Sequence, residues 1–221
     1  MSRVASRFLI VAMATLMATG WITATPQPAA AVSPNVVISQ VYGAGGNASA
    51  IYQNDYIELY NRGAVAQSLA GWSLQYASAI GTGNLGATTT TLTELPNVSL
   101  PPGQHYLVRE AVGAGCGGGS IPCGAPLPLP DLVDATPIAM AAGAGKVALV
   151  DQATSLGCNG GSTPCAATQL GHLIDLVGYG TGASGANFFE GTGPAPTLSA
   201  TTAALRGADG ATDTDNNASD F

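Results

Sequence analysis

Two short segments with alternating residues most constrain how this chain can fold. In residues 54–61, Ile57 and Leu59 alternate with polar or aromatic neighbours, the period-two pattern of a half-buried strand. The Asn-Arg-Gly sequence at the end of this segment is typical of a tight turn. Trp72 and Leu74 then alternate with serine and glutamine in a second strand. We therefore predict a small all-β core, whose structural core residues are Ile57, Leu59, Trp72 and Leu74.

The composition also favours short strands joined by many turns. The 221 residues include 30 glycines and 14 prolines, and no helix of useful length is visible. Further strand patterns lie at residues 36–42, 98–100, 105–109, 146–150, 173–180 and 201–206. The Gly/Pro-rich residues 111–144 are excluded as a central strand, and Phe188 and Phe189 are expected in a loop that plugs one end of the core. About seven strands predict a two-sheet sandwich.

The N-terminus has the features of a secretory signal peptide. Arg3 and Arg7 precede the apolar residues 8–17, and small residues lead up to Ala31. We predict a signal over residues 1–31 that is cleaved after Ala31. An uncleaved anchor is disfavoured because the apolar run is shorter than the roughly 20 residues that a span requires. We expect residues 32–221 to form a single exported domain, extracellular or periplasmic, with no membrane span after cleavage.

The charge of the chain argues against binding to nucleic acid. Thirteen acidic residues outnumber six basic ones, giving a formal charge of −7. Removal of the signal leaves four basic residues against thirteen acidic ones, a formal charge of −9. A phosphate-binding surface requires clustered lysines or arginines, and these four are scattered along the sequence. We expect no nucleic-acid binding by this chain alone.

The four cysteines occur in two copies of one pattern, Cys-x-Gly-Gly-Ser-x-Pro-Cys. In an exported protein an even number of cysteines predicts disulfides, with three possible connectivities here. The repeat favours the local pairs Cys116–Cys123 and Cys158–Cys165, because the glycines permit each small loop to close. A four-thiolate zinc site is the alternative, but six residues separate the paired cysteines where two to four are usual.

No recognisable catalytic motif occurs in the sequence. His105 and His172 stand outside any pattern that would join them to a nucleophile or a metal. Glu58 and Asp175 each lie in a predicted strand and could form a carboxylate pair, as in a minimal metal-dependent hydrolase. The simpler interpretation is that each faces solvent opposite an apolar neighbour. We expect no enzymatic activity and no cofactor other than, at most, calcium.

That calcium hypothesis concerns the acidic tail. Asp213, Asp215 and Asn217 resemble the opening of a calcium-binding loop. The pattern is incomplete, because Ala218 stands where glycine is expected and no bidentate glutamate follows. A solvated acidic tail, with Phe221 packed against the sandwich, is favoured over a weak calcium site.

Several segments, in this order, resemble the bacterial branch of the lamin tail domain family: residues 37–42, 55–61, 69–74, 100–103, 145–150, 175–180 and 213–221. The resemblance implies an immunoglobulin-like β-sandwich with no catalytic residues to transfer. In exported bacterial proteins this domain often accompanies a nuclease or phosphatase domain, or acts as a surface module. We therefore expect an exported non-catalytic module for binding, adhesion or docking, with an unknown extracellular or cell-surface ligand. The alternative is the accessory domain of a truncated or split secreted nuclease or phosphatase, because the chain stops at Phe221, where a catalytic domain would begin.

Overall fold

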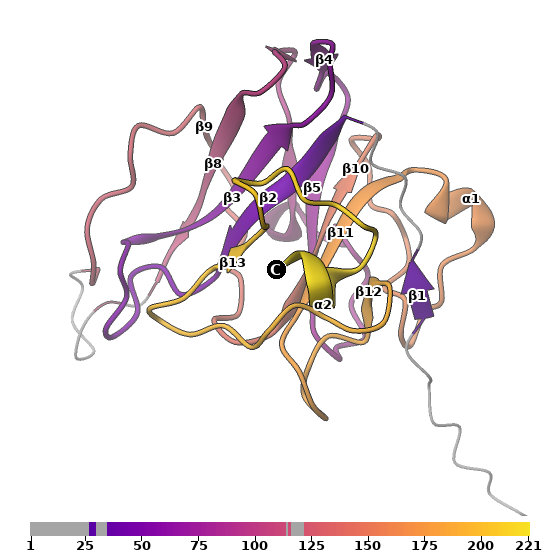
Figure 1. The fold of residues 1–221 in the computed structure, drawn as a ribbon. Coiled ribbons are helices and arrows are strands. Elements are labelled where there is room, and N and C mark those ends of the chain that lie inside the picture. Colours follow the sequence, from indigo (N-terminus) through magenta and orange to yellow (C-terminus); the bar gives the residue numbers. More distant parts are fainter. Residues whose placement is uncertain (1–26, 30–34, 114, 116–121) are drawn as a thin grey trace, which may run out of the picture.

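Two packed β-sheets form the centre of the computed structural model, which describes residues 27–29, 35–113, 115 and 122–221 (Figure 1). The larger sheet has five strands in the order β13-β2-β3-β8-β9. Its strands are β2 (Val36–Tyr42), β3 (Asn54–Asn61), β8 (His105–Val112), β9 (Leu132–Val133) and β13 (Ala204–Leu205). β3 pairs antiparallel with both β2 and β8, which places it at the middle of the sheet.

The second sheet has four strands in the order β11-β10-β5-β6. Its strands are β5 (Ser73–Ser78), β6 (Leu92–Glu94), β10 (Gly145–Val150) and β11 (Leu173–Tyr179). Two short pairs complete the strands: β4 (Gln67–Ser68) with β7 (Ser99–Leu100), and β1 (Gln27–Ala29) with β12 (Phe188–Glu190). The helical elements are η1 (Thr89–Thr91), α1 (Ala167–Leu170) and α2 (Asn217–Asp220). Within the described residues, none of the helices has the length and apolar character needed to cross a membrane.

The all-β immunoglobulin-like sandwich expected from the sequence is confirmed by this arrangement. One local expectation was wrong, because residues 188–190 form the strand β12 instead of a loop. β12 pairs in parallel with β1, so that Gln27 lies opposite Phe188. A pairing between segments this far apart has no local sequence signal. β1 also lies within the predicted signal peptide, upstream of the predicted cleavage site after Ala31.

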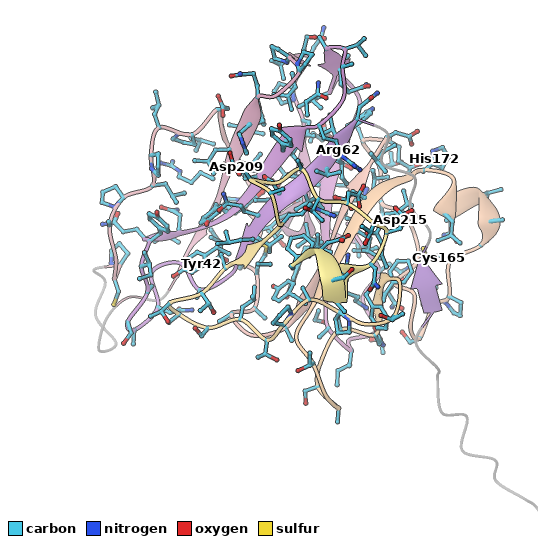
Figure 2. All side chains as sticks on the ribbon, viewed as in Figure 1. Tyr42, Arg62, Cys165, His172, Asp209 and Asp215 are labelled. Carbon is cyan, nitrogen blue, oxygen red and sulfur yellow. A yellow bond between two sulfur atoms is a disulfide. The ribbon has the colours of Figure 1, made fainter. Side chains whose placement is uncertain are left out.

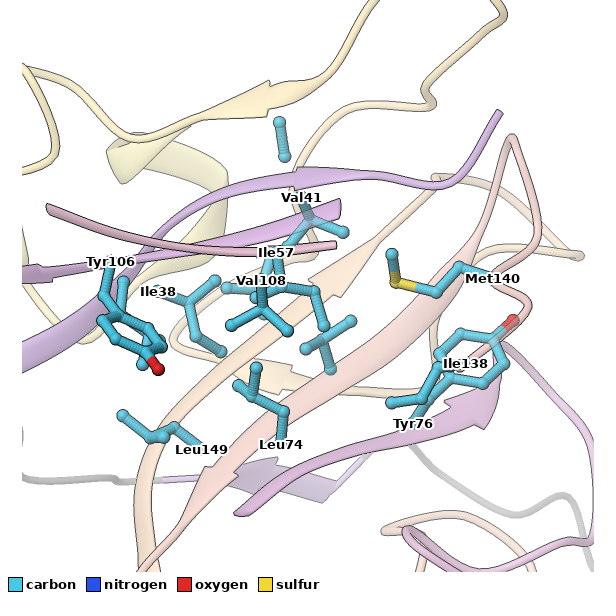
Figure 3. Close-up of a cluster of buried hydrophobic side chains, with 14 of the residues drawn as sticks. Ile38, Val41, Ile57, Leu74, Tyr76, Tyr106, Val108, Ile138, Met140 and Leu149 are labelled. Carbon is cyan, nitrogen blue, oxygen red and sulfur yellow. The ribbon is translucent and has the colours of Figure 1, made fainter. Parts of the chain in front are cut away.

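The main core lies between the two sheets (Figure 3). Ile57 and Leu59 from β3 meet Leu74 from β5 and Leu149 from β10, and all four side chains are fully buried. Their alternation with polar neighbours explains why these segments are strands, since successive side chains point to opposite faces. Complete burial of each such side chain contributes roughly 1.5–3 kcal/mol.

A second apolar cluster covers the other face of the four-stranded sheet. Ala148 and Val150 from β10 pack here, together with Phe188 and Cys158. β10 is therefore buried at every position, which explains its nearly continuous apolar sequence.

Trp72 differs from the predicted core residues around it. It is only partly buried and packs against the edge of the main core. The reason is local: Trp72 lies in a turn directly before β5, where its backbone N–H donates to the Leu69 carbonyl at 3.1 Å. Leu69 is fully buried instead.

Candidate functional site

Arg206 is the centre of a buried polar cluster beside the C-terminal tail. It directly follows β13, and its backbone N–H donates to the Ser39 carbonyl at 2.9 Å, which extends the pairing of β13 with β2. Its side chain is 0% exposed. The guanidinium donates to Asp175 at 2.9 and 3.0 Å, to Asp213 at 3.0 Å and to Asp220 at 3.4 Å. One cation thus holds three carboxylates from β11, the tail and α2.

Asp175 joins the two sheets. It lies in β11 of the four-stranded sheet, but its Oδ2 accepts a hydrogen bond from the Ile38 N–H of β2 at 2.6 Å. Its Oδ1 accepts from the Leu176 N–H at 2.9 Å. Burial raises the pKa of Asp175, and the Arg206 guanidinium opposes this change. The expectation that Asp175 faces solvent was wrong, because it is 0% exposed and closes one side of the sandwich.

Asn217 and Glu190 extend the cluster towards β12. The Asn217 Oδ1 accepts from the backbone N–H groups of Gly178 at 2.8 Å and Glu190 at 3.3 Å. The Asn217 Nδ2 donates to the Leu176 carbonyl at 2.8 Å and to the Glu190 Oε2 at 3.2 Å. All four hydrogen bonds of this amide are therefore made inside the protein. Burial, followed by the nearby Asp175 charge, raises the pKa of Glu190 to about 10.

The structure places the three predicted calcium ligands in different environments. Asp213 lies between Arg206 and Arg62, whose Nη1 donates to it at 2.8 Å. Asp215 is exposed, and Asn217 is buried with its amide oxygen occupied. Figure 2 shows Arg62 and Asp215 near the C-terminal segment. Calcium binding by this set stays a prediction, and it would require Asn217 to release a backbone N–H.

The expectation of a solvated acidic tail was wrong for its buried residues. Asn217 and Asp220 are 0% and 1% exposed, and the Asp213 side chain is 2% exposed. Phe221 packs against the main core, and the Arg206 guanidinium carbon lies 4.6 Å from the centre of its ring. The physical reason is that Arg206 is buried, so its carboxylate partners are drawn inside with it.

An open groove lies on the outer face of the five-stranded sheet. Since Ile57 and Leu59 point into the core, Tyr56 and Glu58 of the same strand point outward. The groove has a volume of about 140 Å³ and is lined by Gln40, Tyr52, Tyr56, Glu58, Leu107, Leu127 and Pro128. The rings of Tyr52 and Tyr56 meet edge to face, with centroids 5.8 Å apart.

Glu58 is the polar centre of this groove. Its Oε1 is close to three donors: Ser39 Oγ at 2.7 Å, Gln40 Nε2 at 2.9 Å and His105 Nδ1 at 2.9 Å. The Tyr56 hydroxyl in turn donates to the Gln40 Oε1 at 3.0 Å. Among the described residues, Glu58 Oε2 makes no hydrogen bond. Glu58 and Asp175 thus have separate sets of partners, on the groove and in the buried cluster.

Two further buried carboxylates were not found by sequence reasoning. Asp55 accepts from the backbone N–H groups of Gly45 and Met140, both at 2.8 Å, and burial raises its pKa to about 7. Glu110 accepts from the Ile138 N–H at 2.7 Å, and burial raises its pKa to about 8. Both hold loops onto the sheet. The available signal for Asp55 was its position within the strand pattern at residues 54–61; Glu110 directly follows the pattern at residues 105–109.

Protonation of Glu110 also fits the position of Thr93. The Thr93 hydroxyl lies 2.7 Å from an oxygen of Glu110 and 2.7 Å from an oxygen of Asp134. One hydroxyl carries one hydrogen and can donate to only one of them. A proton on Glu110 satisfies the second short contact, in agreement with its raised pKa.

Lys146 is another buried charge that sequence reasoning treated only as part of a strand. It is 0% exposed, and its Nζ donates to the Asn159 carbonyl and to the Asn187 Oδ1, both at 2.9 Å. Burial lowers its pKa to about 8. Lys146 therefore anchors the loop closed by Cys158 and Cys165 onto β10.

The structure contains the disulfide Cys158–Cys165, with 5.1 Å between the Cα atoms. Both cysteines are buried in the second apolar cluster. Of the predicted pair Cys116–Cys123, Cys116 lies outside the described residues, and Cys123 is disulfide-bonded.

The two histidines lie in separate places. His105 borders the Glu58 network, and its ring lies 4.6 Å from that of Tyr60. His172 is half exposed and contacts Asp151 at 2.8 Å on the surface. Within the part of the chain that the structure describes, each histidine ring bonds a carboxylate, and neither bonds a serine or cysteine side chain directly.

These features define an immunoglobulin-like β-sandwich whose polar interior is made of structural hydrogen bonds. The family model of the lamin tail domain matches residues 29–181, and the chain therefore belongs to the lamin tail domain family, a family of non-enzymatic immunoglobulin-like domains. The match includes the groove strands and Asp175 but ends before Glu190 and Arg206. No curated protein matches the chain.

Proposed function

We propose that this chain is an exported, non-catalytic module that binds a neutral glycan through the groove on β3. The observation that carries the proposal is the hydrogen bonding of the Glu58 carboxylate within the groove. Three donors hold its Oε1, so the carboxylate is fixed in orientation. Its Oε2 makes no hydrogen bond within the described residues and can accept one from a ligand hydroxyl. A pre-oriented acceptor of this kind is typical of binding sites.

The remaining lining suits a sugar ring. Tyr52, Tyr56, Leu107 and Leu127 provide apolar surface beside the polar Glu58, as in ligand sites that combine aromatic walls with a few placed polar groups. The volume of about 140 Å³ is below that of a drug-sized pocket and suits one ring of a longer chain. The formal charge of −9 that remains after removal of the signal disfavours anionic polymers, which supports a neutral ligand.

The non-catalytic part of the proposal is supported by the hydrogen bonds that the buried carboxylates accept from the backbone. Asp55, Glu110 and Asp175 each accept a hydrogen bond from a backbone N–H of another segment. These bonds hold loops and sheets together, a structural role. Binding to a glycan would also serve an accessory domain of a truncated or split secreted nuclease or phosphatase. This is the alternative function proposed from the sequence.

Export is supported by two features. Residues 1–31 have the composition of a secretory signal, and the disulfide Cys158–Cys165 favours an oxidising compartment, extracellular or periplasmic. We further propose that the source is bacterial and that residues 32–221 form one domain. Cleavage after Ala31 would remove β1 and leave β12 without this partner.

The test is co-sedimentation of the purified chain with insoluble neutral polysaccharides, cellulose and uncharged β-glucan. Wild type is compared with Tyr52→Ala and with Glu58→Gln. We expect the wild type to be retained, and retention to fall about tenfold in each variant, since each removes a contact worth roughly 1–1.5 kcal/mol.

The control is Val133→Ala, which removes an exposed apolar side chain from β9 of the same sheet, outside the groove lining. It should keep wild-type retention. Failure of the wild type to bind any polysaccharide, or equal losses in Val133→Ala and Tyr52→Ala, would refute the proposal. Release of soluble sugar in the same tubes would contradict the non-catalytic assignment.

A further inference from the structure

Beside the Arg206 cluster lies a buried carboxylate oxygen that makes no hydrogen bond with the described part of the chain. Glu190 is 0% exposed, and its Oε1 has no partner among the described residues. Carboxylate oxygens of Asp175, Glu190 and Asp213 all lie within 4.8 Å of one another. We propose that these three residues bind a hard divalent cation, with Ca²⁺ as the best fit.

The unpaired Glu190 oxygen points to a ligand because burying a charged carboxylate without compensation is costly. The other oxygen, Oε2, accepts one hydrogen bond from the described residues, from the Asn217 amide at 3.2 Å. The neighbouring carboxylates of Asp175 and Asp213 add negative charge close by. Either a proton or a cation must neutralise Glu190, and the closeness of three carboxylates favours a cation.

The charge balance of the cluster leads to the same conclusion. Four carboxylates, those of Asp175, Glu190, Asp213 and Asp220, have side chains that are almost fully buried. Two guanidiniums, those of Arg206 and Arg62, contact them. Fully ionised, the cluster would keep two negative charges inside the protein. One divalent cation removes that excess.

The donor atoms decide the class of cation. All three residues offer carboxylate oxygens, which suit Ca²⁺ and Mg²⁺ and disfavour metals that select sulfur or imidazole. Ca²⁺ tolerates irregular coordination, whereas Mg²⁺ demands a near-ideal octahedron. Since Asp175 and Asp213 also bind Arg206, we expect affinity in the weak range of extracellular modules, roughly 10⁻⁴–10⁻³ M.

This arrangement differs from the tail loop predicted from the sequence. The tail loop would use Asp215 and Asn217, whereas the cluster uses Asp175 and Glu190, and both share Asp213. The exposed Asp215 therefore separates the two possibilities.

The experiment measures thermal unfolding and isothermal titration of the full chain after treatment with EDTA. Ca²⁺ is the probe, and wild type is compared with Glu190→Gln and Asp215→Asn. At a Ca²⁺ concentration 100 times the dissociation constant we expect a rise in Tm of roughly 5–10 °C for wild type. Glu190→Gln should lose this rise while keeping its Tm in EDTA at or above that of wild type, because glutamine lowers the buried negative charge. Asp215→Asn should keep the rise.

Three results would overturn the inference. Absence of heat and of a Tm shift in wild type would mean that a proton neutralises Glu190. A Tm shift that survives in Glu190→Gln would place the cation elsewhere, and a shift lost in Asp215→Asn would place it in the tail loop. The titration of wild type requires no variant, so absence of binding refutes the inference even if Glu190→Gln fails to fold, and Asp215→Asn still separates the cluster from the tail loop.

Discussion

Replacing Arg206 with methionine removes the positive charge that three buried carboxylates share. The Arg206 side chain is 0% exposed, and its N–O distances to Asp175, Asp213 and Asp220 are 2.9, 3.0 and 3.4 Å. Methionine fills part of the volume but leaves the charges of Asp175 and Asp220 without this partner. Removing one partner of a buried ion pair costs about 3–5 kcal/mol. A domain of this size loses about 2–4 °C in Tm per kcal/mol, so we expect Tm to fall by roughly 6–20 °C.

The measurements are thermal unfolding, for the change in Tm, and urea unfolding, for the free energy of unfolding, both followed by far-UV circular dichroism in EDTA so that bound cations do not contribute. Arg62→Met is the matched control, because Arg62 also pairs with Asp213 but its side chain is 31% exposed. A partly exposed pair of this kind contributes at most about 1 kcal/mol. If Arg206→Met lost no more free energy of unfolding than Arg62→Met, the idea that Arg206 stabilises the fold by neutralising the buried carboxylates would be wrong.

Three further predictions concern other parts of the fold. Burial raises the pKa of the Glu110 carboxyl from 4.5 to about 8, so the folded state binds the carboxyl proton more tightly than the unfolded chain does. The contribution of this proton to the stability of the fold is complete below about pH 4.5 and is lost as the pH rises through 8. Tm measured from pH 5 to 9 should fall less steeply in Glu110→Gln than in wild type, and equal slopes would show that Glu110 does not titrate there. The double variant Cys158→Ser/Cys165→Ser should lower the free energy of unfolding by about 2–3 kcal/mol, the loop-closure value for this short loop; a urea midpoint unchanged from wild type would argue that the disulfide adds nothing. Leu74→Ala should cost about 2–5 kcal/mol of unfolding free energy. Trp72→Ala should cost less than Leu74→Ala, because Trp72 is partly exposed and lacks the roughly 3–5 kcal/mol of a buried tryptophan. A larger fall in Tm for Trp72→Ala than for Leu74→Ala would make Trp72 the core residue instead.

The sandwich could be predicted because its strands have local patterns. Ile57 and Leu59 alternate with outward-facing residues, and this period alone identifies a half-buried strand. The prediction that Trp72 is a core residue failed because Trp72 lies in the turn before β5. Outside a strand, alternation no longer determines which side chains are buried. The strand β12 could not be found, since its partner β1 is more than a hundred residues away in the sequence.

The buried cluster was harder to predict for the same reason. Arg206 contacts Ile38, 168 residues away, and Asp175, 31 residues away. The position of Asp175 inside an apolar strand is the one local signal that a carboxylate is buried there, and sequence reasoning assigned it to solvent. The groove could be predicted only in part. Tyr56 and Glu58 share the outward face of one predicted strand, but Leu127, which also lines the groove, lies in a loop that has no strand or helix pattern in the sequence.

The most direct measurement for the proposed function is a titration of isotope-labelled chain with a soluble neutral oligosaccharide, followed by backbone amide chemical shifts. We expect the shifted resonances to cluster at Tyr52, Tyr56, Glu58, Leu107 and Leu127, and Tyr52→Ala to require about tenfold more oligosaccharide for the same shifts. Shifts confined to another surface, or no shifts at millimolar ligand while the protein remains folded, would contradict the assignment of the groove as a glycan-binding site.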